Sequence, residues 1–93
     1  MENISEQYWG RALKLARQYE SGQVEFADLT GLIDEFSAAF FEEIGGLSPS
    51  MRSACSKDLE SRLTTAMNSE GQSLPCREAM SEILVALNRI PIY

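Results

Sequence analysis

The residues of this chain with the clearest chemical potential are carboxylates, and half of them lie in one stretch. Of the 14 Asp and Glu residues, seven fall between residues 18 and 51, where there is no Lys or Arg. The 93-residue chain has a net charge of −6, and this stretch holds that excess of negative charge. Within it, Asp28, Glu35 and Glu42 recur every seven residues, a spacing that places three carboxylates on one face of a helix. Such a surface is either compensated by another part of the fold or kept for a basic partner.

Two pairs of neighbouring carboxylates, Asp34-Glu35 and Glu42-Glu43, raise the question of a metal site. Hard cations need several converging oxygen ligands, and adjacent residues of a helix point about 100° apart. We therefore expect no metal ion and no other cofactor. The chain also has no histidine, so the commonest general base and metal ligand is missing. We expect that the protein is not an enzyme.

The two cysteines, Cys55 and Cys76, fall on apolar faces of predicted helices. Free cysteine in that setting usually behaves as a small buried hydrophobe rather than as a nucleophile. If the helices that carry them pair as an antiparallel hairpin, about 16 Å of helix rise separates the two residues. A disulfide cannot span that distance, so we predict two free thiols.

Composition favours one ordinary globular domain over residues 1–93, because 44% of the residues are hydrophobic and 24% are charged. The sequence has no run of about 18 apolar residues and no basic segment followed by an apolar one at its start. We expect a cytoplasmic protein that does not enter a membrane. Its acidic balance argues against nucleic acid as a direct ligand.

Apolar residues recur at helical spacing in four segments, and none of the segments shows the alternation of a strand. We predict helices over about 5–20 and 24–44, a third that opens at Ser48-Pro49, and a fourth with Pro75 in its first turn. The predicted fold is all-α, a compact four-helix bundle built from two helical hairpins. Its predicted core faces are Ile4, Tyr8, Ala12, Leu15 and Tyr19; Phe26, Leu29, Ile33, Phe36 and Phe40; Met51, Cys55, Leu59, Leu63 and Ala66; and Cys76, Met80, Ile83, Leu87 and Ile90.

The acidic row need not serve a partner, because the first helix carries cations that could neutralise it. A hairpin that turns at Gly22 brings together residues whose numbers sum to about 45. The expected neighbours are Arg17 with Asp28, and Arg11 and Lys14 with Asp34 and Glu35. An acidic face that is simply solvated is the other unspecific reading.

The far end of the acidic stretch has no such cations opposite it. Next to Glu42 and Glu43 lies Phe41, an aromatic residue that is predicted to point away from the core stripe of its helix, on the side shared with Asp34. Aromatic side chains and desolvated charges are the groups that contribute most at interfaces. The predicted partner is a protein with a basic surface, and the predicted partner-binding residues are Asp28, Asp34, Glu35, Phe41, Glu42 and Glu43.

One run of residues is similar to a known family. Its apolar and small positions are Leu13, Leu15, Ala16, Tyr19, Ser21, Gly22, Val24 and Phe26. This order resembles small helical immunity proteins of the colicin D type and of contact-dependent inhibition systems, where an apolar helix and a short turn lead to a helix that opens with an aromatic. The resemblance implies a bacterial inhibitor that masks the positively charged active site of a toxin nuclease, with acidic residues that imitate RNA phosphates.

Two other interpretations stay open. The protein could be a helical adaptor or regulatory subunit that acts as a homodimer, with Val85, Ile92 and Tyr93 as its seam. It could also be a phage-type mimic of nucleic acid, for which the row of acids spaced by seven is the supporting feature.

Overall fold

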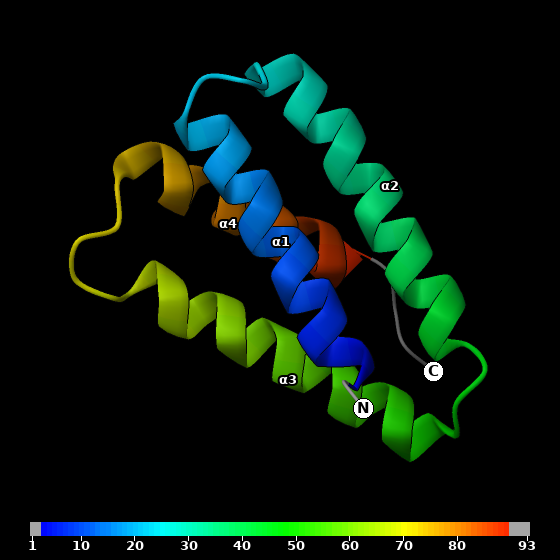
Figure 1. Cartoon of the computed structure of the whole chain (residues 1–93). Coiled ribbons are helices and arrows are strands. Elements are labelled where there is room, and N and C mark those ends of the chain that lie inside the picture. Colours follow the sequence, from blue (N-terminus) through cyan, green and yellow to red (C-terminus); the bar gives the residue numbers. More distant parts are fainter. Residues whose placement is uncertain (1–2, 90–93) are drawn as a thin grey trace.

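A computed structural model describes residues 3–89 as four α-helices joined by short loops (Figure 1). The helices are α1 (Ile4–Glu20), α2 (Phe26–Ile44), α3 (Pro49–Met67) and α4 (Leu74–Arg89). No strand occurs within this range. The prediction of an all-α four-helix bundle is confirmed.

The two hairpins, α1–α2 and α3–α4, pack on each other mainly through α1 and α4. α1 and α4 each contact all the other helices, whereas α2 and α3 scarcely touch. In Figure 1, α1 lies in front of α4, α2 runs along one side and α3 along the other. α2 therefore packs by one side only, against α1 and α4, and its opposite side faces solvent.

Local sequence signals explain where the helices begin and end. The Asn3 side chain accepts a hydrogen bond from the Glu6 backbone N–H at 2.8 Å, and the Ser48 hydroxyl accepts one from Met51 N–H at 3.4 Å. Gly22 follows α1 with a positive φ of 81°, a conformation that glycine adopts without steric cost. The predicted caps and the predicted turn are confirmed. The second helix begins at residue 26, two residues later than predicted.

Aromatic packing fixes α1 against α2 at the centre of the bundle. The ring of Tyr8 meets the rings of Phe36 and Phe40 edge-to-face, with centroids 5.5 and 5.1 Å apart. The residues of the predicted core that are fully buried are Tyr8, Ala12, Leu29, Ile33, Phe36, Phe40, Leu59, Leu63, Cys76, Met80, Ile83 and Leu87. The core also contains residues that the prediction omitted, namely Ala16, Ile44, Ala79 and Ala86. Ile90 lies outside the described residues.

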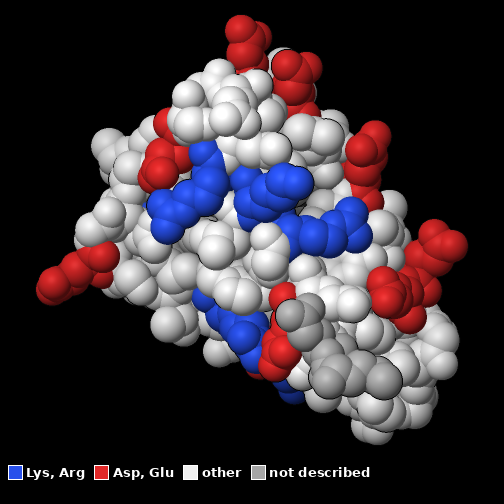
Figure 2. Space-filling view, in the orientation of Figure 1, with Lys and Arg blue, Asp and Glu red and all other residues white. Residues whose placement is uncertain are grey.

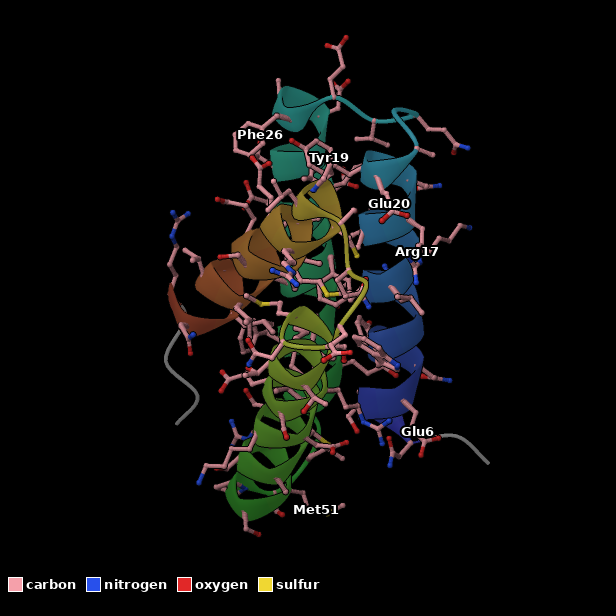
Figure 3. The ribbon with its side chains drawn as sticks, turned by 90° about the vertical axis from the view of Figure 1, so that its left-hand side faces the viewer. Glu6, Arg17, Tyr19, Glu20, Phe26 and Met51 are labelled. Carbon is pink, nitrogen blue, oxygen red and sulfur yellow. The ribbon has the colours of Figure 1, made fainter. Side chains whose placement is uncertain are left out.

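Two predicted core residues are exposed instead. Phe26 is 45% exposed and Met51 is 54% exposed, and Figure 3 shows them at opposite ends of the molecule. Each lies in the first turn of its helix, beyond the level at which the neighbouring helices cover the apolar stripe. Phe26 keeps a partner in Tyr19, whose ring centroid is 6.4 Å away. Helical periodicity identifies the correct face but does not show where the covering helix ends.

A polar network ties the start of α1 to the middle of α3. The Ser5 hydroxyl, although its residue is buried, hydrogen-bonds the Asp58 carboxylate. Arg62 donates to the same carboxylate at 3.1 Å and also forms an ion pair with Glu6 at 3.7 Å. The hydrogen bond from Ser5, followed by that from Arg62, lowers the pKa of Asp58.

Replacing Ser5 with Ala tests whether this network stabilises the fold through the charged form of Asp58. Because the folded-state pKa of Asp58 lies below its ordinary value of 3.8, its contribution is complete above that pH and is lost as the pH falls through the lowered pKa. We expect Ser5→Ala to lower the free energy of unfolding by about 1 kcal/mol near pH 7, with a smaller effect at pH 2. Urea unfolding at both pH values measures this, with the exposed Ser61→Ala as the control. A difference that does not change with pH would contradict the role assigned to Asp58.

Candidate protein-binding surface

The solvent side of α2 carries the row of acids that the sequence predicted. Asp28, Glu35 and Glu42 are all exposed and share one face of the helix, which we call the acidic row. Figure 2 shows acidic side chains along the edge of the molecule formed by α2. The row faces outward because the stripe of α2 that packs on α1 and α4 leaves only the opposite side for charged residues.

The prediction that cations of α1 neutralise this row by ion pairing is wrong. Among residues 3–89, the ion pairs within 4.0 Å are Arg17–Glu20, Arg62–Glu6 and Arg62–Asp58, so none involves α2. Arg17 bonds Glu20 on its own helix at 3.2 Å rather than Asp28.

Arg11 is also directed elsewhere, because its guanidinium carbon lies 4.7 Å from the centre of the Tyr8 ring. This contact is a cation–π interaction with a core aromatic residue. Arg11 and Lys14 do border the same groove as Glu35, so the predicted proximity of these three side chains is correct.

Asp34 is separated from the cations that were predicted to face it. It lines a cleft of about 120 Å³ between α2 and α4, together with Glu82 and Arg89. One residue of helix turns the side chain by about 100°, which is enough to move Asp34 from the α1 side of α2 to the α4 side. Asp34 and Glu35 therefore belong to different surfaces.

Glu43 is part of the fold rather than a spare charge. The hydroxyl of Tyr8, a residue only 4% exposed, donates a hydrogen bond to the Glu43 carboxylate at 2.8 Å. Burial, followed by this hydrogen bond, raises the pKa of Tyr8. Glu43 has no ion-pair partner among residues 3–89, but its carboxylate accepts a hydrogen bond that the prediction did not include. The sequence did contain a signal for this hydrogen bond. Tyr8 lies on the predicted core face, and a buried phenolic hydroxyl usually has a hydrogen-bond partner.

Phe41 is less exposed than a residue off the core stripe would suggest. It is half-buried, it packs against the core, and its ring lies 5.6 Å from that of Phe40 in an edge-to-face contact. Part of its surface is therefore used within the fold. Among the three residues predicted at this end, Glu42 is the one that the fold leaves as an exposed charge without a bonded partner in the described chain.

The charges of α2 oppose its helix dipole at one end. The last turn contains Glu42 and Glu43 and no basic residue, so carboxylates lie beside the partial negative charge of the helix C-terminus. The hydrogen bond from Tyr8 offsets this repulsion at Glu43. In the part of the chain that the structure describes, no comparable contact offsets it at Glu42, so that charge adds nothing to local stability there.

Other chemistry finds little support in the described part of the chain. Within residues 3–89, no group of three or more potential ligands is placed to hold a metal ion. Cys55 and Cys76 are both free thiols, as predicted. Burial raises the pKa of Cys76, which disfavours its thiolate form.

Comparison with models of protein families, with curated proteins and with solved structures finds no match. Over residues 3–89, no helix has both the length and the apolar character that crossing a membrane requires.

Replacing Glu42 and Glu43 one at a time with Ala tests their different roles. Both substitutions remove one carboxylate from the same helix turn. We expect Glu42→Ala to raise the free energy of unfolding by about 0.3–1 kcal/mol, because it removes repulsion with the helix dipole. We expect Glu43→Ala to lower it by about 1–3 kcal/mol, because the buried Tyr8 hydroxyl loses its partner.

Urea unfolding at low ionic strength measures both effects. Adding Tyr8→Phe to Glu43→Ala removes the orphaned hydroxyl and should recover part of the loss. Equal effects of the two Ala substitutions would contradict the division of roles between these neighbours.

Proposed function

We propose that this protein is a cytosolic, non-enzymatic inhibitor that docks the acidic row of α2 on a basic protein surface, and that its partner is a toxin nuclease. The observation that carries the proposal is the row itself. Asp28, Glu35 and Glu42 are exposed, and none of them has an ion-pair partner among residues 3–89. A surface that the fold neither neutralises nor needs is available for an external cation.

The dimensions of the row suit a basic cleft. Seven residues of helix rise about 10.5 Å, so the three carboxylates extend over roughly 21 Å. The distance of about 10.5 Å between successive carboxylates exceeds the Debye length of about 8 Å at physiological salt, so each carboxylate acts as a separate local charge. Such a row would speed association with a basic partner and make the rate depend on salt.

A nuclease supplies the matching surface, because an active site that holds a phosphate backbone is rich in Lys and Arg. The resemblance of residues 13–26 to immunity proteins of the colicin D type supports this class of partner. In this chain, those residues form the end of α1, the turn at Gly22 and the start of α2. The turn therefore sets the position of the helix that carries the acidic row.

Within the proposed interface the residues have unequal roles. Glu42, Glu35 and Asp28 make the direct contacts, and Asp34 extends the surface toward α4. Phe41 and Glu43 hold the end of α2 in place through the core and through Tyr8. The two other interpretations stay predictions. In the homodimer interpretation drawn from the sequence, the seam consists of Val85, Ile92 and Tyr93. Val85 is exposed, whereas Ile92 and Tyr93 lie outside the described residues.

Affinity capture from the native host tests the proposal. The baits are the wild type, Glu42→Lys and, as a matched control, Glu70→Lys, which makes the same charge change in the exposed loop between α3 and α4. We expect wild type and Glu70→Lys to enrich the same basic nuclease, and Glu42→Lys to lose it.

Kinetics with the captured nuclease then test the mechanism. The association rate should fall about tenfold or more between low salt and 0.3 M salt, and the complex should lack nuclease activity. Identical enrichment by all three baits, or an association rate that salt does not alter, would overturn the proposed mechanism.

A further inference from the structure

The outer face of the α1–α2 hairpin carries two rows of opposite charge. α1 contributes Arg11, Lys14 and Arg17, which we call the basic row, and α2 contributes the acidic row. Figure 2 shows basic side chains gathered across the middle of this face and acidic ones along its α2 edge. No ion pair within 4.0 Å joins the two rows in the described chain.

A groove of about 270 Å³ separates the rows. Its apolar lining comes from Leu15, Leu32 and Phe36, while Arg11 and Glu35 border it from α1 and α2 respectively. The face therefore presents an apolar strip between two charged rims of opposite sign. A partner that fits it must offer a negative row to α1 and a positive row to α2.

At two positions on these helices, neither the backbone conformation nor the packing of the described residues requires glycine. Gly31 in α2 and Gly10 in α1 are exposed, and neither has a positive φ. A Cβ atom added to either would meet no atom within 4 Å. Glycine inside a helix costs about 1 kcal/mol relative to alanine. No contact among residues 3–89 offsets that cost, whereas a close approach from outside would make use of the missing side chain.

We propose that this face binds a second copy of the chain. A two-fold axis parallel to α1 and α2 places α1 of each copy on α2 of the other, so each basic row meets an acidic row. Two-fold interfaces use the same patch on both subunits, which requires a patch that is complementary to itself. A face of one charge sign would repel its own copy, but a basic row beside an acidic one satisfies this requirement.

The register of the hairpin identifies the pairs. Arg11 and Glu35 border the same groove, and the guanidinium carbon of Arg11 lies 5.8 Å from the ring centre of Phe36, the residue next to Glu35, so Arg11 and Glu35 lie at about one level along the helices. Across the proposed axis, Arg11 of one copy faces Glu35 of the other. About two turns further on, Arg17, which bonds Glu20 on its own helix, faces Asp28 of the other copy, and Gly31 lies between these levels. Glu42 lies beyond the end of the basic row, so the dimer leaves it open. The dimer covers Asp28 and Glu35, so the basic partner proposed above must displace the second copy to reach the whole acidic row.

The size of the face predicts a reversible dimer. α1 and α2 have 17 and 19 residues, and a rise of 1.5 Å per residue makes them about 26–28 Å long. With helices about 10 Å wide, the face can bury roughly 500 Å² per copy. The total of about 1,000 Å² is at the lower limit for a specific interface. Exposed charges supply much of the contact, so salt should weaken the dimer.

Sedimentation velocity over a range of protein concentrations tests the proposal, with circular dichroism to verify folding. We expect a wild-type dimer at low salt that dissociates on dilution and in 0.3 M salt. Arg11→Glu and Glu35→Arg should each weaken it about tenfold or more, because each change introduces repulsion twice across the axis. The double variant should return to within about threefold of wild type, because both pairs are restored with reversed sign.

Two further variants separate this interface from other effects. Lys57→Glu reverses an exposed cation on α3, outside the face, and should leave the dimer unchanged. Gly31→Gln replaces glycine with a better helix former, so it should not lower the melting temperature, but its side chain should prevent dimerisation.

The Glu42→Lys variant separates the test of the dimer from the test of partner binding. It should leave the dimer intact while it abolishes capture of the basic partner. A monomer under all conditions would overturn the proposal. A dimer that Arg11→Glu, Glu35→Arg and Gly31→Gln do not weaken would also overturn it.

Discussion

The packing of Tyr8 against α2 is the contact on which the rest of the structure depends. Its ring lies between α1 and the buried stripe of α2, edge-to-face with Phe36 and Phe40, and its hydroxyl bonds Glu43. These contacts fix the rotation of α2 about its own axis. Because that rotation buries one stripe, the residues spaced by seven on the opposite side must face solvent. The acidic row is a consequence of the core.

The same helix shows a conflict between its own stability and its surface. A helix that lacks Lys and Arg has no favourable i,i+4 ion pairs, and carboxylates in its last turn oppose its dipole. Packing resolves part of the conflict, since Tyr8 bonds one of the two carboxylates in that turn. The rest is unresolved within the described chain. Positions that a fold tolerates without stabilising are where a binding function is most readily sought.

Much of the fold follows from the sequence, because its determinants are local. Asn3 and Ser48 mark helix starts through hydrogen bonds to nearby backbone N–H groups, and apolar periodicity identifies which side of each helix is buried. The acidic row follows from the same periodicity. The errors at Phe26 and Met51 arise because the end of a covering helix is a property of the whole bundle.

The details of the candidate surface depend on tertiary geometry in the same way. That Glu43 bonds Tyr8, and that Asp34 turns toward α4, depends on rotations of about 100° between neighbouring residues and on the crossing of helices distant in sequence. The expected ion pairs between α1 and α2 fail for a related reason. Antiparallel register places Arg11 and Glu35 at one level, but a groove keeps the charged groups apart.

That separation makes the charge pattern of the hairpin informative. Had the two rows paired within the chain, the face would be neutral and would select no partner by charge. Because they remain apart, the face keeps a positive and a negative edge, and Glu42 extends the negative edge past Arg11, the first cation of α1. Association through the paired rows uses Asp28 and Glu35, and a basic partner that binds the whole acidic row must compete with the second copy for these two residues. Glu42 lies outside the paired rows and serves recognition of the basic partner alone.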